Sequence, residues 1–416
     1  MSRAACSPNR AVWSRRLWLL PAVSSLVVGL AACTSTTTTP DATTTQLTKL
    51  ARQLVDAGAP GVIVRVTDGH GKTVEIAEQA PWTQPDGKLD VGDEFRMGSN
   101  TKTLLATLTL QLVAEGKLAL TDPVQRWLPG QVPNGEAITL RMLLNHTSGL
   151  FDYTNDPAVL ASMLGKDQRQ WASAELIALA TQHEPLFAPG TEWSYSNTDY
   201  TVVGALLEQV TGKSLAALIH DRIAAPLHLQ HTYFPADATW QGRYAHGYEP
   251  DPAHMPADVP AEYREVTGSP RDGYVDVSAN NPSWGGAAGA IVSTAQDWPV
   301  FYTALMSGKL LPAAQLAEMR TTVSMDPDNP QAPRAGLGIQ TASTSCGTIW
   351  AHEGGITGYS SVNLTDDTGQ RSASVLVPTD FPFEFAGDPK LSEAYKTLYT
   401  STLCVMFDKP AEQNPN

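Results

Sequence analysis

The chain of 416 residues is poor in cysteine, in basic residues and in charge overall, and each shortage narrows its possible functions. Its four cysteines include no C-x-x-C pair and no Cys/His cluster, which argues against a zinc site. The 28 lysines and arginines are outnumbered by 42 acidic residues. The resulting formal net charge of −14 argues against a nucleic-acid partner, which needs a basic patch. Because 42% of the residues are apolar, the chain can bury a large core.

Residues 1–33 have the composition of an export signal. Arg15 and Arg16 precede an apolar run, Leu17–Ala32, that is too short for a comfortable transmembrane helix. The run ends in Leu-Ala-Ala-Cys33, which resembles a bacterial lipobox, so we expect Cys33 to be lipidated and to hold the protein on the extracytoplasmic face of the cell membrane. An ordinary signal peptide with an unrelated cysteine is the alternative. The choice between Sec and twin-arginine export stays open.

The remaining chain is expected to contain one folded domain. Residues 34–45 are mostly Thr and Ser and lack an apolar face, which predicts an extended tether. The folded domain is expected over residues 46–409, followed by a polar tail, residues 410–416. There is no internal repeat and no second linker of this kind, and we expect a monomer.

Two cysteines of the folded domain remain to be paired. Cys6 lies in the signal and Cys33 is the proposed lipid attachment site, which leaves Cys346 and Cys404. An even pair in an exported protein favours a disulfide. Two free buried thiols are the alternative.

The hydrophobic patterning predicts an α+β fold in which an antiparallel sheet is flanked by helices and shares its core with a mostly helical inserted lobe. The turn residues Gly69-His70-Gly71 separate two alternating segments and predict a β-hairpin. The expected strands are 60–68, 72–78, 337–341, 349–352, 360–365 and 372–377. The expected helices are 99–116, 172–182, 200–211, 214–225, 294–307 and 391–407.

Ser99 and Lys102 lie three residues apart at the start of the expected 99–116 helix, so their side chains share a face. A serine hydroxyl becomes a nucleophile when a neighbouring base takes its proton, and a desolvated lysine can be that base. Backbone N–H groups at the first turn of a helix can also stabilise an oxyanion. A capping serine followed by an exposed lysine is the alternative.

Two further segments supply the groups that such a pair needs. Tyr195-Ser196-Asn197 offers a phenol that can shuttle protons and an amide that can orient the lysine and a substrate carbonyl. The segment from His352 to Gly355 follows an expected strand and offers a strand edge with a second oxyanion donor. The competing triplet Tyr153-Thr154-Asn155 lacks the Pro-Gly-x-x-Trp-Ser lead-in, so we interpret it as loop structure.

These three elements, in this order and spacing, resemble the penicillin-recognising serine hydrolases. That superfamily contains class C β-lactamases, D-alanyl-D-alanine carboxypeptidases of the Streptomyces type and related esterases. The resemblance covers nearly all of residues 46–407 and implies a β-lactamase/transpeptidase-like fold. Leu-Leu-Asn-His-Thr-Ser-Gly-Leu at 143–150 and Ala-Ala-Gly-Ala-Ile-Val-Ser-Thr-Ala-Gln-Asp at 287–297 look like two further family segments.

The resemblance implies a role for each motif residue. Ser99 is the acylated nucleophile, Lys102 its base, Tyr195 the proton shuttle, Asn197 the orienting amide, and His352 belongs to the third motif. The oxyanion is expected between the backbone N–H groups of Ser99 and Gly355, with Glu353, Gly354 and Gly355 contacting substrate. Class C β-lactamases carry Lys-Thr-Gly where this chain has His352-Glu353-Gly354, which favours the carboxypeptidase or esterase branch.

The residues expected to contact the substrate carboxylate also differ from those of related carboxypeptidases. Related carboxypeptidases read the terminal carboxylate with hydroxyls and an arginine, whereas this chain has Glu353 and, on the preceding strand, Gln340. Because a carboxylate repels an anionic terminus, we expect uncharged esters or amides to be hydrolysed better than free-carboxylate peptides. Alternatively, Glu353 points away along the outer strand face and another cation such as Arg334 binds the terminus.

The remaining histidine and glycine clusters are expected to be structural. His146 is interpreted as a hydrogen-bonded structural residue and the pair His228 and His231 as structural, despite its metal-like spacing. Gly285–Gly289 is not a dinucleotide fingerprint, and we expect neither a metal nor a cofactor.

The sequence thus predicts a serine hydrolase that acts through an acyl-enzyme on a small peptide, amide or ester, in the manner of a D-alanyl-D-alanine carboxypeptidase, with peptidoglycan as a candidate substrate. The alternatives are a carboxylesterase or β-lactamase, and a non-catalytic penicillin-binding-like module that recognises cell wall. The presence of Ser99, Lys102, Tyr195 and Asn197 together favours the enzyme.

Overall fold

The computed structural model describes residues 41–256, 259–384 and 388–410, and the whole of residues 1–40, with Cys33 and the expected signal peptide, lies outside them. The expected antiparallel sheet is confirmed. It has eight strands in the order β2-β1-β13-β12-β11-β10-β9-β8. Their bounds are β1 (Gly61–Thr67), β2 (Thr73–Gln79), β8 (Val323–Ser324), β9 (Arg334–Ala335), β10 (Gln340–Ser343), β11 (Thr348–Ile356), β12 (Tyr359–Thr365) and β13 (Ser372–Val377).

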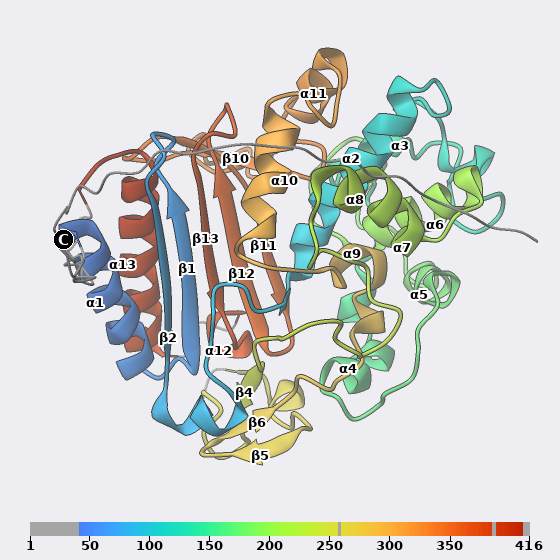
Figure 1. Ribbon diagram of the computed structural model, residues 1–416. Coiled ribbons are helices and arrows are strands. Elements are labelled where there is room, and N and C mark those ends of the chain that lie inside the picture. The colour runs from blue at the N-terminus through green and yellow to red at the C-terminus, as the bar shows by residue number, and fades with distance from the viewer. Residues whose placement is uncertain (1–40, 257–258, 385–387, 411–416) are drawn as a thin grey trace, which may run out of the picture. The chain divides into compact units, whose positions relative to one another are not determined.

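Two helices from opposite ends of the described chain cover one face of this sheet (Figure 1). They are α1 (Ala42–Asp56) and α13 (Pro389–Met406). Leu47, Leu50 and Leu54 of α1 repeat at helical spacing and pack into a buried cluster with Val62 of β1 and Leu398 of α13.

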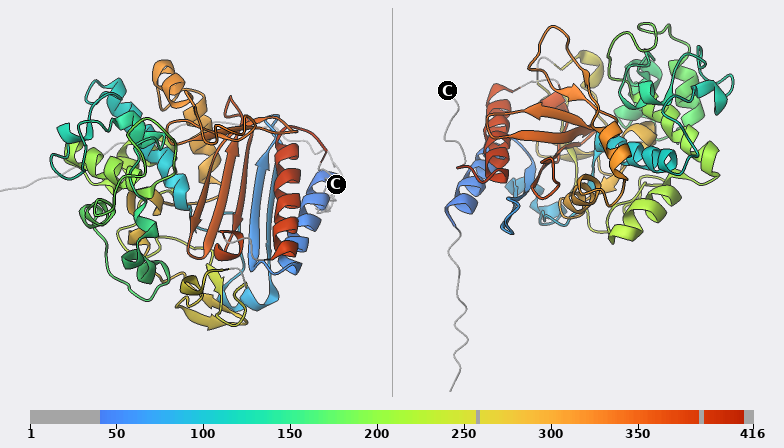
Figure 2. Two further views of the ribbon diagram at one scale, coloured as in Figure 1. Left: turned by 180° about the vertical axis from the view of Figure 1, so that it is seen from behind. Right: turned by 90° about the horizontal axis from the view of Figure 1, so that it is seen from above.

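The other face of the sheet packs against the largest hydrophobic cluster, in which α2 (Thr101–Ala114) is almost completely buried. Seen from above, the sheet lies between α13 on one side and α2 with the helical lobe on the other (Figure 2). The lobe and its neighbours contain α3 (Leu140–Leu144), α4 (Pro157–Met163), α5 (Ser173–Ala180), α6 (Asn197–Thr211), α7 (Leu215–Ile219), α8 (Ala225–Leu227), α9 (Gly286–Gly289), α10 (Asp297–Met306), α11 (Ala313–Met319) and α12 (Phe381–Glu384).

Two smaller sheets complete the fold. β3 (Phe95–Arg96) pairs with β7 (Val292–Ser293) just before the Ser99 turn. β4 (Tyr248–Pro250), β6 (Tyr274–Asp276) and β5 (Ser269–Arg271) form a three-stranded sheet. No strand was expected from the sequence in this last region, because three-residue strands are too short to show an alternating pattern.

The expected tether needs a correction at its C-terminal end. Residues 42–45 were assigned to it, but helix α1 already begins at Ala42. The Asp41 side chain accepts a hydrogen bond from the Thr44 N–H at 2.9 Å and so caps the helix. This cap, together with the buried leucines that follow, outweighs the low helix propensity of the threonines.

A second correction concerns the strand expected over residues 337–341, which starts only at Gln340 in β10. Gly338 has a φ of +69°, and a Cβ there would lie 2.5 Å from the Ala106 Cβ of α2. The chain therefore turns tightly against α2 before it enters the sheet, and only glycine permits both the turn and the close approach.

The Cys346–Cys404 disulfide is confirmed and joins the residues before β11 to α13. No single helix of the described residues has both the length and the apolar composition to cross a membrane. Helix α6 and the segment Leu215–Leu227 together are long and apolar enough for a membrane span, by length and composition only, but they are bent by 80° relative to each other.

Candidate active site

The S-x-x-K pair lies at the junction of a short turn and a buried helix. Ser99 belongs to a 3₁₀ turn, Gly98–Asn100, and Lys102 lies in the first turn of α2 with no exposed surface. The Lys102 Nζ donates to the Ser99 Oγ at 2.9 Å, which confirms that the two side chains share a face. The capping-serine alternative, with an exposed lysine, is wrong.

Lys102 is surrounded by acceptors and deprived of water. Its Nζ also donates to the Asn197 Oδ1 and to the carbonyl oxygen of Ala288, each at 2.8 Å. Burial lowers the pKa of Lys102 to about 7, although the carboxylates of Asp152 and Asp199 oppose this. A lysine with a pKa near neutrality can exchange a proton with a serine at physiological pH.

The second motif comes to the same point from a different element. The Tyr195 Oη donates to the Ser99 Oγ at 2.6 Å, and the Lys102 Nζ lies 4.8 Å from the centre of the Tyr195 ring. Asn197 is the first residue of α6, and its Nδ2 donates to the Asp152 Oδ2 at 3.0 Å. The amide is therefore fixed with its oxygen toward Lys102.

Close backbone approach explains how the third motif reaches the turn that carries Ser99. A Cβ on Gly354 would lie 2.0 Å from the Met97 carbonyl oxygen, and a Cβ on Gly98 would lie 2.8 Å from the Gly355 nitrogen. The absence of both side chains lets β11 pack directly against the Ser99 turn. Ser99 and Gly355 both line the cavity, and the binding of an oxyanion between their backbone N–H groups stays a prediction.

His352 lines the cavity, with its ring centre 6.5 Å from that of Tyr195. Its Nδ1 lies 2.6 Å from the carbonyl oxygen of Glu353, which is consistent with an Nδ1–H donor. Burial, with the positive charge of Lys102, lowers the pKa of His352 to about 3. His352 is therefore neutral at physiological pH and differs in charge from a lysine at this place.

A cavity of about 750 Å³ opens above these groups. The motif residues on its wall are Ser99, Tyr195, Asn197, His352, Glu353, Gly354 and Gly355. Gln340 also lines the cavity, as expected, whereas Arg334 is exposed, donates to Thr322 and does not line it. The alternative in which Arg334 binds a substrate carboxylate is therefore not supported.

The triplet Tyr153-Thr154-Asn155 has a larger part than the loop assignment gave it. It forms a 3₁₀ turn in which Tyr153 is fully buried and donates to the Trp284 carbonyl oxygen, while Thr154 and Asn155 line the cavity. Neither this contribution nor that of Asp152 could be read from the sequence, because nothing local in the sequence shows that this turn meets α6.

His146 is structural, as expected. Its Nδ1 lies 2.9 Å from the Asp199 Oδ2, both groups are buried, and the His146 ring packs 4.6 Å from the Tyr195 ring. His228 is exposed at a helix end, and the His231 Nδ1 lies 3.1 Å from the Glu94 Oε1.

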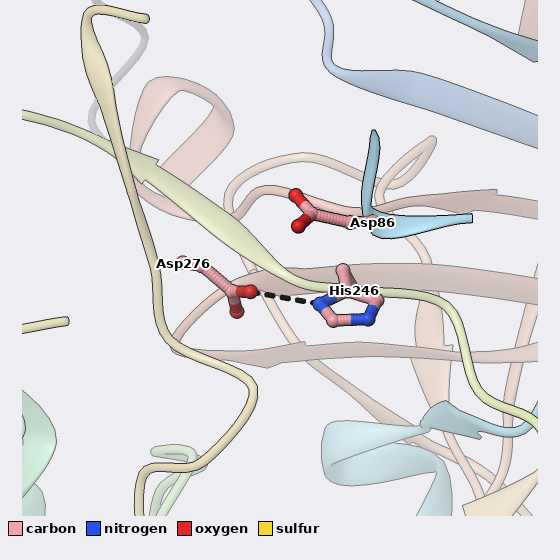
Figure 3. A group of neighbouring side chains, drawn as sticks. All are labelled: Asp86, His246 and Asp276. Carbon is pink, nitrogen blue, oxygen red and sulfur yellow. Dashed lines mark hydrogen bonds and ion pairs between the residues drawn. The ribbon is translucent and has the colours of Figure 1, made fainter. Parts of the chain in front are cut away.

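In the described ranges, one group of side chains has metal-ligand proximity: Asp86, His246 and Asp276 (Figure 3). Its ligand atoms are already engaged. Arg271 donates to both Asp86 oxygens, at 2.8 and 2.7 Å, and the His246 Nδ1 lies 2.7 Å from the Asp276 Oδ2. The guanidinium supplies the positive charge that a metal would bring, so the cluster is explained as an ion-pair network.

Comparison with known proteins agrees with this geometry. Residues 47–394 match the family described as Beta-lactamase. The D-stereospecific amidohydrolase of Streptomyces sp. is 37% identical in sequence, with a TM-score of 0.71 over 85% of this chain and 98% of that one. The D-amino acid amidase of Ochrobactrum anthropi SV3, in complex with L-phenylalanine, is 26% identical, with a TM-score of 0.72 over 85% and 98%.

Among curated proteins, the esterase EstB of Burkholderia gladioli is 35% identical over 218 residues, which are 49% of this chain and 53% of EstB. The match thus spans about half the length of that relative. The chain belongs to the beta-lactamase family of serine penicillin-recognising proteins. Members of this family are serine hydrolases, among them esterases, amidases and β-lactamases.

Proposed function

We propose that the protein is an amidase or esterase that works through an acyl-enzyme on Ser99. One observation carries this proposal: the Ser99 Oγ, on the wall of the cavity, lies within hydrogen-bond distance of both the Lys102 Nζ and the Tyr195 Oη. A hydroxyl with two proton-transfer partners is equipped to lose its proton as it attacks. A pure binding module needs no such arrangement.

The proposed reaction has two halves. Lys102 in its neutral form, with Tyr195, takes the Ser99 proton while the Oγ bonds to the substrate carbonyl carbon, and the carbonyl oxygen becomes an oxyanion between the Ser99 and Gly355 N–H groups. The tetrahedral adduct collapses, and the leaving amine or alcohol departs with a proton returned by Tyr195. A water molecule then attacks the acyl carbon and gives one proton to Lys102 and Tyr195. The bond between this carbon and the Ser99 Oγ breaks, the Oγ takes the proton back, and the acid is released.

An amide or ester is a better candidate substrate than a peptide with a free terminal carboxylate. No lysine or arginine of the described ranges lines the cavity, while Glu353 and Asp380 do. A D-alanyl-D-alanine carboxypeptidase must bind an anionic terminus, and two carboxylates disfavour one. The similarity to a D-stereospecific amidohydrolase and a D-amino acid amidase supports amides of D-amino acids as the class to test first.

The experiment is covalent labelling combined with turnover. Purified protein is treated with a fluorophosphonate probe, and hydrolysis is measured on a D-amino acid amide, a short-chain ester and a diacyl-D-Ala-D-Ala peptide. We expect labelling at Ser99, hydrolysis of the amide or the ester, and loss of both in Ser99→Ala. Labelling that persists in Ser99→Ala would refute the assignment of the nucleophile.

We also propose that the protein acts outside the cytoplasm as a lipoprotein. The support is the lipobox at Cys33 together with the Cys346–Cys404 disulfide, a bond that persists in oxidising compartments. A Cys33→Ser variant should leave the membrane fraction of the producing cell, and its full recovery there would contradict lipid attachment.

A further inference from the structure

The active-site cavity continues round the open edge of β11 onto the face of the sheet that α13 covers. β10 pairs with β11 only as far as Gln340 and Ala351, so the β11 edge beyond them borders the cavity. Along a strand the side chains alternate, and Glu353 and Gly355 therefore face away from His352 and Gly354. The lining on the α13 face includes Gln340, Glu353, Gly355, Ser360, Val362, Asp380, Ser392 and Tyr395.

We call Glu353, Asp380 and Tyr395 the acidic subsite. Asp380 is only 8% exposed and still lines the cavity, and its Oδ1 accepts a hydrogen bond from the Ser360 hydroxyl at 2.9 Å. A Cβ on Gly355 would lie 2.7 Å from that same Oδ1. Glycine at this position thus leaves the Asp380 carboxylate next to the backbone that is proposed to hold the substrate carbonyl.

A buried carboxylate holds Asp380 in place. Glu249 has no exposed surface and accepts hydrogen bonds from the backbone N–H groups of Gly358, at 2.7 Å, and Asp380, at 3.1 Å. It therefore joins the turn after β11 to the segment that carries Asp380. Burial, with the nearby Asp380 charge, raises the pKa of Glu249 well above its usual range, so Glu249 positions Asp380 as a hydrogen-bond acceptor and the negative charge of the subsite comes from Glu353 and Asp380.

The second side of the subsite combines a carboxylate with an aromatic ring. Glu353 and Tyr395 of α13 both line the cavity, and burial, with the Glu353 charge as a smaller cause, raises the pKa of Tyr395 and Tyr399. The Glu353 side chain is accessible from the cavity, yet the protein packed around it raises its own pKa. A carboxylate and an aromatic side chain on the wall of one cavity are groups that can bind an ammonium ion.

We propose that the acidic subsite binds a protonated amine of the substrate, so that the enzyme selects amides or esters with a free amino group near the scissile carbonyl. The inference rests on the proposed function, since it names the substrate class of the same cavity. The acidic subsite is part of the active-site cavity. Ser99 determines where the substrate carbonyl lies, and Glu353 and Asp380 determine which charge the neighbouring substrate group can carry.

The test compares two substrates that differ only in this charge. Values of kcat and KM are measured at pH 7 for D-phenylalanine amide and for N-acetyl-D-phenylalanine amide, in the wild type and in Glu353→Gln and Asp380→Asn. We expect the wild type to prefer the free amine at least tenfold in kcat/KM. Each variant should reduce this preference at least fivefold, mainly by raising KM for the free amine.

Glu393→Gln is the matched control. Glu393 is exposed on α13, the helix that carries Tyr395, and it does not line the cavity. It changes the net charge by the same amount and should retain the wild-type preference. Glu353 is accessible, so its variant tests the proposal even where Asp380→Asn folds poorly.

The failures can be told apart. Equal or better hydrolysis of the N-acetyl substrate, or an equal effect of Glu353→Gln and Glu393→Gln, overturns the acidic subsite while Ser99 labelling is retained. Absence of both labelling and hydrolysis for every substrate overturns the proposed function itself.

Discussion

The two faces of β11 differ in how they meet the rest of the protein. On the face toward α2, Gly354 is buried against the Met97 carbonyl, and His352 is buried and kept neutral. On the face toward α13, Glu353 and Gly355 are exposed to the cavity, and Asp380 lies beside Gly355. One strand therefore contacts the Ser99 turn through its backbone on one side and presents Glu353, beside Asp380, to the cavity on the other. Substitutions on the α13 face can therefore change the substrate preference without changing the residues around Ser99.

The largest effect is expected from Lys102, at the centre of the closed face. Lys102→Met keeps an unbranched side chain but removes the base, so kcat should fall by about 10²–10⁴-fold. Steady-state kinetics on an ester and circular dichroism are the measurements. Lys117→Met, which changes an exposed lysine beyond the same helix, is the control. Activity within threefold of the wild type would show that another group takes the Ser99 proton.

The two glycines of β11 provide the most direct comparison of the faces. Gly354→Ala forces a Cβ against backbone that cannot yield, so we expect a loss of stability of about 1–3 kcal/mol and reduced turnover on every substrate. Gly355→Ala meets a carboxylate side chain, which can move. It should mainly weaken the preference for a free amine. Denaturant unfolding and the substrate pair above test both, and similar outcomes for the two variants would contradict the distinction.

The pH dependence follows from the lowered pKa of Lys102. The base must be neutral to accept a proton, so kcat/KM for an uncharged ester should rise about tenfold per pH unit below pH 7 and level off above it. His352, with a pKa of about 3, stays neutral between pH 5 and 9 and adds no step there. A stopped-flow or plate assay over that range checks the profile, and a flat profile would exclude Lys102 as the titrating base.

The smallest effect on activity is expected from the disulfide, which joins α13 to the residues before β11. Replacing Cys346 and Cys404 together by serine releases a link across 58 residues and should lower the free energy of unfolding by about 2–4 kcal/mol. The kcat at 25 °C should stay within twofold, because neither cysteine lines the cavity. Urea unfolding with and without reductant measures the first quantity. An unchanged midpoint would show that the bond does not stabilise the fold.

Local signals predicted the elements on which the chemistry depends. The hairpin of β1 and β2 was readable because two alternating segments flank a glycine turn, and the Ser99–Lys102 pair was readable because helical spacing is fixed. The errors fall where short strands or a tertiary contact override local preference. Residues 42–45 are helical because leucines further along α1 are buried, and β10 starts late because Gly338 must approach Ala106.

The sequence by itself predicted that Ser99, Lys102 and Tyr195 act together, and it predicted the antiparallel sheet and the Cys346–Cys404 pair, because residue types, local patterning and the order of the motifs carry these signals. Only the tertiary structure decided that Asp152 fixes Asn197, that the Ala288 carbonyl binds Lys102, and that Asp380 lies beside Gly355. These contacts join residues that are far apart in the chain. Their chemistry arises from which backbones meet and from the water that the packing excludes, and neither is encoded in any one segment.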